Sequence, residues 1–282
     1  MPVSPSSNAQ AAREALAALL RELRLDAGLT GRELASRAGW STAKASRIGN
    51  ARTAPSDADI RAWCVACGVE EKADDLIAAN RSADSLYIEW RRKQRTGLRR
   101  LQESAVPLFE RTRHFRVYCS NVVPGLIQTD GYARALLTSI TDFRRIPNDV
   151  EQAVEARMAR SRVIREGNHR FGLILEEDVL YYGFGGAEVM AGQLGHLLAV
   201  MSLPSVSLGI IPRTAPRRMW PIETFMVFDD KRAAVEMLSA DVTVMAPSEV
   251  AMYVRAFGEL AEMAVYGGRA RSLVTDAITS LG

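Results

Sequence analysis

Hydrophobic residues recur at three- and four-residue intervals in the first part of the chain. Between Ala11 and Ala27, the leucines at positions 16, 19, 20 and 23 fall on one helical face, and Gly28 follows as a residue that often ends helices. Residues 1–10 carry Ser, Pro and Asn without such a pattern. The sequence therefore predicts a disordered tail over residues 1–10, followed by a first helix.

Two short helices around a glycine turn are predicted next. Thr30 and Glu33 have the spacing of a capping box, in which each side chain accepts a hydrogen bond from the other residue's backbone N–H at a helix start. A second helix is therefore expected over Gly31–Ala38. Gly39 then turns the chain, and Ser41 is suited to cap a third helix that continues through position 48.

Two further helices complete this predicted unit. Capping residues precede a run in which Ile60, Trp63 and Cys67 place apolar groups on one helical face, and a glycine ends it. A fifth helical segment lies near Glu70–Asn80. Because five helices over residues 11–80 can enclose a small core, an all-α domain is expected at the N-terminus.

A long helix is predicted between this domain and the rest of the chain. From Ala83 to Ala105, one stripe of residues recurs at helical spacing, and Pro107 marks the end of the helix or a kink. The predicted connecting helix spans residues 81–112. Arginines between Arg91 and Arg100 lie largely off the stripe, where they either follow a phosphate backbone or form an ordinary solvated face.

The remainder of the chain, residues 113–282, mixes strands and helices. Branched and aromatic residues predict strands over Phe115–Cys119, Phe171–Leu175, Val206–Ile211, Thr224–Phe228 and Ala233–Leu238. Helical periodicity covers Thr129–Ser139, Val150–Glu166, Ala187–Met201, Pro247–Tyr266 and Ala270–Ser280. Neighbouring strand candidates late in the chain suggest hairpins, so an α+β domain is predicted.

Composition and charge add a location and a partner class to this picture. A chain of 282 residues with 48% hydrophobic and 24% charged residues fits a folded protein of two domains. Its first ten residues lack the basic start and apolar core of a signal peptide, so a cytoplasmic location is expected. Met1–Arg113 contains 19 Lys and Arg against 14 Asp and Glu, whereas the remainder contains 17 against 19. Polyanion binding is therefore expected in the front half.

The segment from Leu19 to Ser56 resembles the helix-turn-helix of the lambda repressor and Cro type, the Xre group. The resemblance rests on Gly28-Leu29-Thr30, Glu33-Leu34-Ala35, Gly39, Ser46-Arg47-Ile48 and Pro55. The sequence departs from that family at Gly49 and Ala51, where Glu and Gly are typical. The resemblance implies a DNA-binding domain whose third helix has a looser or differently shaped exit.

The third predicted helix would read DNA. A recognition helix buries one face, for which Ala45 and Ile48 are suited, while its N-terminal part reaches base edges in the major groove. Lys and Arg can donate to guanine, and Ala or Thr methyl groups can contact thymine. We assign base reading to Thr42, Ala43, Lys44 and Arg47. We assign phosphate binding to the flanking residues Thr30, Arg32, Asn50 and Arg52. The alternative is that all of these are ordinary solvated residues.

Cysteine spacing offers little chemistry. Cys64 and Cys67 form a C-x-x-C pair, which can bind zinc or form a disulfide, but no second Cys or His pair completes a tetrahedral site. Packing in the core is therefore favoured for both. With Cys119 the chain has three cysteines, an odd number that argues against a secreted disulfide framework.

Other candidate sites are weak for similar reasons. The glycines of Gly183–Gly186 precede a helix, but no P-loop lysine follows, so a turn is favoured over a nucleotide site. Glu176–Asp178 could serve acid/base or metal chemistry, yet a polar turn after a strand explains them equally well. The histidines stand far apart, at His114, His169 and His196. We predict no metal site, no cofactor and no enzymatic activity.

The second half also resembles a known family, the partner domain of actinobacterial regulators of the WhiJ type, described as antitoxin-like transcriptional regulators. The motifs that carry the resemblance are Val123–Thr129 with Tyr132-Ala133-Arg134, Glu188-Val189-Met190 with Gln193-Leu194, and Phe257-Gly258-Glu259-Leu260. The resemblance implies a small BldB-like partner protein and a role in development, antibiotic production or toxin neutralisation.

Two functions are compatible with these observations. The first is a sequence-specific transcriptional regulator, expected to be a repressor, that binds double-stranded DNA as a homodimer. Its C-terminal domain would bind a small protein or a small-molecule effector. The second is an antitoxin-like module that neutralises a small partner and uses its helix-turn-helix only for autoregulation. Specific, salt-dependent DNA binding is the test of the first, and toxicity of the neighbouring gene in the absence of this protein would identify the second.

Overall fold

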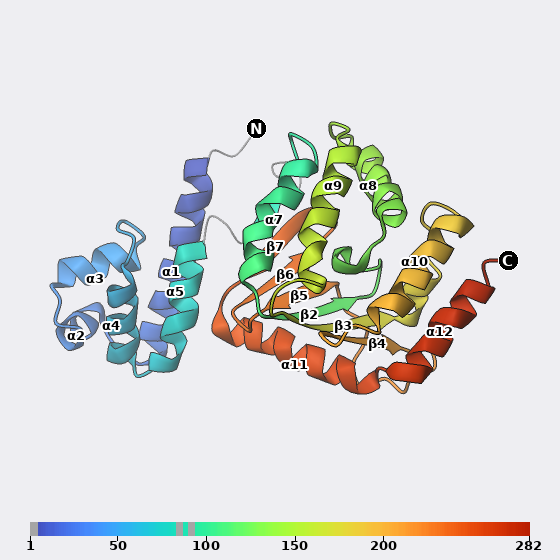
Figure 1. Ribbon diagram of the computed structural model, residues 1–282. Coiled ribbons are helices and arrows are strands. Elements are labelled where there is room, and N and C mark those ends of the chain that lie inside the picture. The colour runs from blue at the N-terminus through green and yellow to red at the C-terminus, as the bar shows by residue number, and fades with distance from the viewer. Residues whose placement is uncertain (1–4, 83–86, 90–93) are drawn as a thin grey trace. The chain divides into compact units, whose positions relative to one another are not determined.

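The structure, a computed structural model, describes residues 5–82, 87–89 and 94–282. Two compact units make up the chain (Figure 1). The first comprises Met1–Tyr87 and Thr243–Val250, and the second comprises Ile88–Val242 and Ala251–Gly282. Each unit has its own hydrophobic core, and each is described by itself below.

The N-terminal unit is helical, as predicted. Its elements are α1 (Pro5–Asp26), α2 (Gly31–Arg37), α3 (Thr42–Gly49), α4 (Asp57–Cys67), the 3-10 helix η1 (Glu70–Lys72) and α5 (Ala73–Ser82). The first helix begins at Pro5, six residues before the predicted start, so residues 5–10 are helical where a disordered tail was expected. Proline is well suited to the first turn of a helix, and the alanines that follow favour its continuation. Residues 1–4 lie outside the described residues.

The predicted capping residues define the starts of the short helices. Thr30 Oγ1 accepts a hydrogen bond from Glu33 N at 3.2 Å, and Glu33 Oε2 accepts one from Thr30 N at 2.8 Å. Ser56 and Asp59 form the same reciprocal pair at the start of α4. Gly68 ends α4 with a φ of 73°, a left-handed conformation that favours glycine. These local interactions explain why the element pattern could be predicted from the sequence.

The core of this unit is organised around one tryptophan. Trp63 on α4 is 2% exposed and packs among Leu20, Leu34, Ile48 and other buried residues of the five helices. Its indole Nε1 donates a hydrogen bond to Leu20 O at 2.9 Å. Because that carbonyl belongs to α1, the indole joins α4 to α1 in the interior of the unit, where a hydrogen bond is costly to lose.

The prediction of a long connecting helix is wrong. The described parts of this region contain the short strand β1 (Tyr87–Glu89), a turn at Gly97 and the helix α7 (Arg99–Arg111), whereas residues 83–86 and 90–93 lie outside the description. Gly97 has a φ of 96°, which breaks helical geometry. Asp149 caps α7 from a distant part of the chain, accepting hydrogen bonds from Leu98 N at 2.7 Å and Arg99 N at 2.9 Å. Pro107 lies inside α7 and does not end it.

The second unit is built on one mixed sheet. Within the described residues, the sheet has seven strands in the order β1-β7-β6-β5-β2-β3-β4. The remaining strands are β2 (His114–Cys119), β3 (Arg170–Glu176), β4 (Val206–Ile211), β5 (Phe225–Phe228), β6 (Arg232–Glu236) and β7 (Ala240–Val244). Strands β2, β3 and β4 are parallel, while β5 pairs antiparallel with β2 and with β6. All five predicted strands form, and the α+β class is confirmed.

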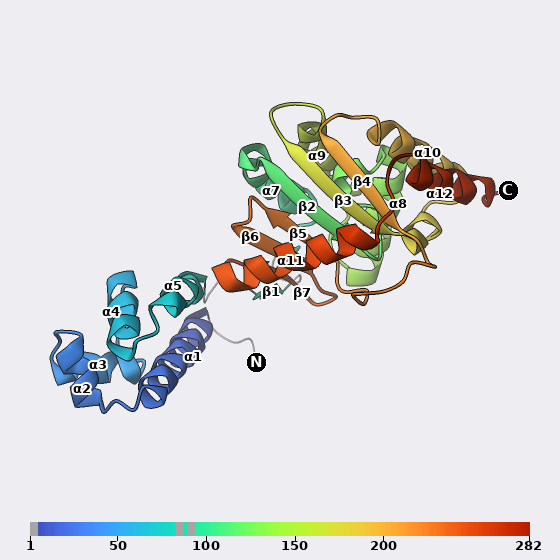
Figure 2. The ribbon, with the colours of Figure 1, turned by 90° about the horizontal axis from the view of Figure 1, so that it is seen from below.

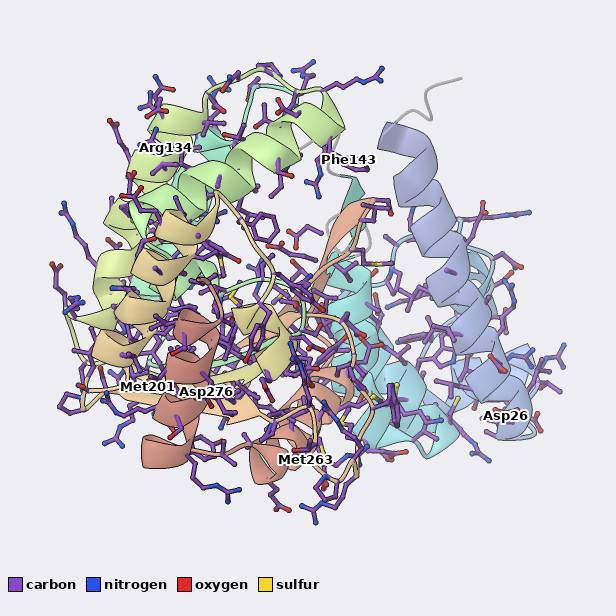
Figure 3. All side chains as sticks on the ribbon, turned by 90° about the vertical axis from the view of Figure 1, so that its right-hand side faces the viewer. Asp26, Arg134, Phe143, Met201, Met263 and Asp276 are labelled. Atoms are coloured by element: carbon purple, nitrogen blue, oxygen red, sulfur yellow. The ribbon has the colours of Figure 1, made fainter. Side chains whose placement is uncertain are left out.

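Helices cover both faces of this sheet. They are α8 (Asp130–Arg144), α9 (Val150–Ser161), α10 (Ala187–Val200), α11 (Pro247–Met263) and α12 (Gly267–Thr279), with the 3-10 helices η2 (Gly125–Ile127), η3 (Arg162–Ile164) and η4 (Glu177–Leu180). Figures 1 and 2 show α7, α8 and α9 on one face and α11 on the other. Arg134, labelled in Figure 3, forms ion pairs with Asp130 and with Glu151, joining α8 to α9 at the surface.

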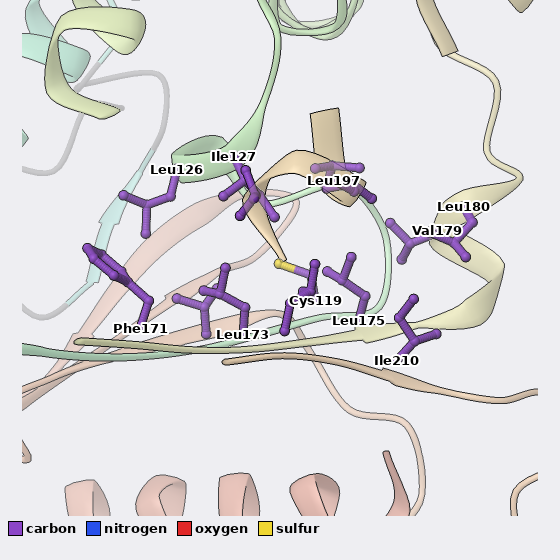
Figure 4. Packing of buried hydrophobic residues seen from close by; sticks show 14 of the residues in the cluster. Cys119, Leu126, Ile127, Phe171, Leu173, Leu175, Val179, Leu180, Leu197 and Ile210 are labelled. Atoms are coloured by element: carbon purple, nitrogen blue, oxygen red, sulfur yellow. The ribbon is translucent and has the colours of Figure 1, made fainter. Parts of the chain in front are cut away.

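The main core lies between the sheet and the helices of its α7–α9 face. Figure 4 shows Leu126 and Ile127 of η2 above Leu173 and Leu175 of β3, with Leu197 of α10 beside them. All five side chains are almost completely buried. The short η2 segment therefore fills the centre of the core and is fixed there by packing, together with the loop on either side of it.

Candidate nucleic-acid interface

The third helix buries the face that the sequence predicted. Ser41 caps α3 by accepting a hydrogen bond from Lys44 N at 3.2 Å. Ala45 is 4% exposed and Ile48 is 2% exposed, and both belong to the core of the N-terminal unit. Burial of these positions turns the opposite side of the helix outward, where Thr42, Ala43 and Arg47 are exposed. Three of the four predicted base-reading residues therefore share the solvent-facing side of α3.

Lys44 has a different environment from the other three. Its ammonium group forms an ion pair with Asp59 Oδ1 on α4 at 2.5 Å and lies 4.4 Å from the centroid of the Trp40 ring. Desolvation acts to raise the pKa of Asp59, but the hydrogen bonds from Lys44 and from Ser56 outweigh it and hold that pKa below its ordinary value. Lys44 is thus held against the domain, and a base contact would require the side chain to leave Asp59.

The predicted phosphate-binding residues flank α3 from both sides. Thr30 and Arg32 are exposed at the start of α2, and Arg52 is exposed in the loop after α3. Asn50 is exposed too, but its amide nitrogen donates to Ser46 O at 2.8 Å and so folds back on α3. Arg32 and Arg52 therefore present their charged groups to solvent, whereas Thr30 is the N-cap of α2 and Asn50 is the C-cap of α3.

The unusual residues after α3 have a structural explanation. Ala51 has a φ of 55°, in the left-handed region where the resembled family typically places glycine. Gly49 is buried, and a Cβ atom at this position would lie 3.4 Å from the Trp63 ring. A Cβ atom at that distance would be in van der Waals contact with the ring, so the end of α3 packs closely on Trp63. The exit from α3 is therefore tightly packed and not loose.

Two arginines that the sequence analysis did not single out support this region. Arg21 donates a hydrogen bond to Gly49 O, and Arg24 donates one to Leu29 O. Both lie on α1, and their partners are the last residue of α3 and the turn before α2. Their position near the C-terminal end of an amphipathic helix was the available signal, because cationic side chains there often bind free carbonyl groups.

Cys64 and Cys67 pack in the core, as favoured from the sequence. Both are unpaired thiols in the buried cluster around Trp63. Burial, reinforced by Cys67 and by acidic neighbours on η1, raises the pKa of Cys64 to about 11, and burial also raises the pKa of Cys67. Since the thiolate is the reactive form, neither thiol is activated.

Thiol labelling tests this assignment. We expect the native protein to react slowly with Ellman's reagent at about pH 8 and the urea-unfolded protein to release the signal of all three cysteines, because Cys119 is buried as well. Absorbance of the released thiolate gives the count. Rapid reaction of two thiols in the native protein, as in a redox-active pair, would contradict core packing.

The acidic run at the end of β3 forms ion pairs and hydrogen bonds within the fold. Glu176 is buried, accepts a hydrogen bond from the Tyr118 hydroxyl at 2.8 Å and binds the guanidinium of Arg217 through both carboxylate oxygens, at 2.8 and 2.5 Å. Asp178 is paired with Arg213, whose backbone N also donates to Glu177. Within the part of the chain that the structure describes, His, Cys, Asp and Glu form no cluster able to hold a metal ion.

The remaining candidates are structural as well. Gly185 and Gly186 have φ values of 77° and 84°, so the glycine run before α10 is a turn that needs left-handed backbone. His169 Nδ1 lies 2.6 Å from Thr112 O, which fixes that histidine to the end of α7. His196 lies half-buried on α10, and burial followed by the charge of Arg165 lowers its pKa.

Family comparisons agree with this division of the chain. Residues 15–76 match a helix-turn-helix domain, and residues 102–276 match a domain of unknown function, DUF5753. The chain belongs to the DUF5753 family. The N-terminal match covers α2 and α3, which identifies the N-terminal unit as the DNA-binding type of domain. The DUF5753 match contains Val123–Thr129, Gln193 and Phe257–Leu260, the motifs that carry the second resemblance.

Two further findings complete the comparison. No curated protein matches the chain. Among the residues that the structure describes, no helix is both long enough and apolar enough to cross a membrane.

Proposed function

We propose that this DUF5753 protein is a sequence-specific transcriptional repressor that binds double-stranded DNA through α3. The observation that supports the proposal most directly is the division of α3 into a buried face and an exposed face inside a helix-turn-helix domain. The exposed face carries Thr42, Ala43 and Arg47. Arg47 provides the strongest base contact, because a guanidinium can donate two hydrogen bonds to one guanine.

The proposal includes the remaining assigned residues with distinct roles. Thr30, Arg32 and Arg52 bind phosphates and set the position of the domain on the duplex. Asn50 binds a phosphate after its side chain leaves Ser46, and Lys44 contacts a base after its side chain leaves Asp59. The DUF5753 domain binds an effector, either a small molecule or a small BldB-like protein, and no catalytic step or cofactor is involved.

We further propose that the repressor acts as a homodimer on a two-part site. A single recognition helix of eight residues reads too few base pairs for specificity in a genome. Two such helices on half-sites about one helical turn apart, or a multiple of it, would supply the missing contacts. Sedimentation of the protein with its DNA tests the stoichiometry, and full affinity of a monomer for one half-site would contradict the dimer.

Sequencing the DNA that co-purifies with the protein provides the operator for a quantitative test. On that operator, Arg47→Ala is expected to reduce discrimination against altered base pairs by about 1–3 kcal/mol, because a base contact is lost. Arg52→Ala is expected to weaken binding to all DNA sequences equally. It should also lower the slope of the logarithm of the binding constant against the logarithm of salt concentration by about one. Fluorescence anisotropy at several salt concentrations measures both effects.

A matched control separates these effects from a general loss of charge. Arg61 on α4 is exposed and paired with Asp74 at 2.7 Å, so Arg61→Ala removes one charge outside the assigned contacts. This variant should retain both the base preference and the salt slope. If Arg47→Ala behaves like Arg61→Ala, α3 is not the reading helix. Absence of any operator, with rescue of cells from a toxic neighbouring gene product, would instead favour the antitoxin-like function.

A further inference from the structure

A cavity of about 360 Å³ lies within the second unit, on the face of the sheet that α7, α8 and α9 cover. Its walls come from these three helices, from the loop that contains η2, and from β2, β5 and β6. Apolar side chains such as Leu101, Phe109 and Leu136 form much of the lining. A volume of this size is within the range of small-molecule sites.

The charges in the cavity are unevenly balanced. Four arginines line it, Arg144, Arg157, Arg160 and Arg232, together with the carboxylates of Glu236 and Asp241. Arg144, Arg232 and Asp241 have interaction partners within the fold, so the unbalanced charge belongs to Arg157 and Arg160. Two guanidinium groups without an ion pair are unfavourable in a largely apolar cavity unless an anion compensates them, because burial removes the hydration of a guanidinium. The charge pattern therefore points to an anionic occupant.

Arg157 and Arg160 form the centre of this positive charge. They lie one helical turn apart on α9, and Arg157 donates to Gln102 Oε1 at 3.2 Å and to Gln128 Oε1 at 2.6 Å. These partners are neutral amides. Arg160 lies against the Phe109 ring, with its Cζ 4.5 Å from the ring centroid, and its buried Nε has no hydrogen-bond partner among the described residues. Neither guanidinium forms an ion pair within the described part of the chain.

Both guanidinium groups lie beside Gly125 in the loop opposite α9. A Cβ atom on Gly125 would lie 3.3 Å from Arg160 Nη2 and 3.8 Å from the nearest atoms of Arg157. Ser161 donates a hydrogen bond to Gly125 O at 3.0 Å, which keeps the loop close to α9. Gln128, which binds Arg157, also donates to Val123 O at 2.7 Å. The Val123–Thr129 motif thus builds one wall of the cavity.

Burial affects both arginines in the same direction. It lowers the pKa of Arg157, and it lowers the pKa of Arg160 to about 9, with a further contribution from the charge of Arg157. Glu236 opposes this effect at both residues. A guanidinium remains charged in proteins, so two like charges stand close together beside Gly125.

We propose that this cavity binds an amphipathic organic anion, with its carboxylate or phosphate group at Arg157 and Arg160 and its apolar body along Leu101 and Leu136. The anion accepts hydrogen bonds from the guanidinium groups, including the unpartnered Nε of Arg160, and so supplies the missing countercharge. Under the proposed function, this ligand is the effector of the repressor, which favours a small molecule over a partner protein at this site.

Calorimetric titration of the full-length protein tests the proposal without DNA. Octanoate, octyl phosphate and octanol share one apolar chain and differ in the head group. We expect octanoate, octyl phosphate or both to bind at least tenfold more tightly than octanol, and the two anions to distinguish a carboxylate site from a phosphate site. Equal binding of all three, or no binding of either anion, would overturn the proposal.

Two variants with the same change of charge locate the site. Arg160→Met is expected to weaken anion binding at least tenfold, whereas Arg162→Met, an exposed neighbour outside the cavity lining, should bind like the wild type. Without ligand, Arg160→Met should unfold at the same or a higher temperature, because it removes a buried charge that lacks an ion pair. An anion should raise the unfolding temperature of the wild type and not that of Arg160→Met.

The outcomes separate this site from the DNA-binding proposal. If Arg160 has only a structural role, the Arg160→Met protein should be less stable and should bind anions with unchanged affinity. That result would refute the site. Failure of the wild type to bind either anion, with intact Arg47-dependent operator binding, would refute the effector site alone. If the protein binds anions but binds no operator, the anion site is supported and the repressor function is refuted.

Discussion

Replacing Trp63 with alanine is expected to unfold the N-terminal unit at physiological temperature. The substitution empties the centre of a small core and removes the hydrogen bond to Leu20 O. Large-to-small changes of a buried tryptophan cost about 3–5 kcal/mol, which approaches the whole stability of a domain of this size. Hydrogen exchange followed by mass spectrometry should show loss of protection throughout α2, α3 and α4, and operator binding should be lost with it.

The DUF5753 domain of the same chain is an internal control for this experiment. Its amides should keep their protection in the Trp63→Ala protein, because its core is a separate cluster. Trp63→Phe keeps most of the ring volume and loses the indole donor, so a smaller loss of about 1–2 kcal/mol is expected. Equal protection of α3 in the wild type and in Trp63→Ala would show that the indole does not organise this unit.

Replacing Gln193 with leucine is expected to destabilise the DUF5753 domain by about 2–5 kcal/mol. Gln193 is fully buried on α10; its Nε2 donates to Ile127 O at 2.8 Å, and its Oε1 accepts from Thr129 N at 2.7 Å. Leucine fills a similar volume but leaves both backbone groups buried without a partner. Thermal unfolding followed by circular dichroism measures the effect.

The control for this prediction is Gln152→Leu, the same change at an exposed position on α9. It should change stability by no more than about 0.5 kcal/mol. Because Gln193 holds the loop that carries Gln128, the Gln193→Leu protein should also bind organic anions more weakly at Arg157. A Gln193→Leu protein as stable as Gln152→Leu would mean that solvent or a rearranged loop satisfies the two backbone groups.

Local signals explain what the sequence could predict. The starts of α2, α3 and α4 depend on residues no more than three positions away, so Thr30, Ser41 and Ser56 could be recognised without a structure. The same is true of the buried face of α3, which follows from helical spacing. Strand β4 was predicted with its observed bounds because a run of branched residues is flanked by turn residues.

Interactions between distant residues explain what could not be predicted. The start of α7 is capped by Asp149, about fifty positions later, whereas the local sequence before it has a helical pattern. Lys44 lies on the predicted reading face, but its pairing with Asp59 requires the packing of α4 beside α3. Arg157 and Arg160 have the spacing of a solvated helical face, and only the fold shows that this face lines a cavity.

The Asp149 carboxylate has a mechanical consequence. Asp149 is the N-cap residue of α9, and its side chain accepts hydrogen bonds from Leu98 N and Arg99 N, so the start of α7 is fastened to the residue that precedes α9. Any tilt of α9 that accompanies occupation of the cavity must therefore pull on the start of α7. The start of α7 lies just ahead of residue 102, where the DUF5753 match begins, so this pull acts at the N-terminal border of that match.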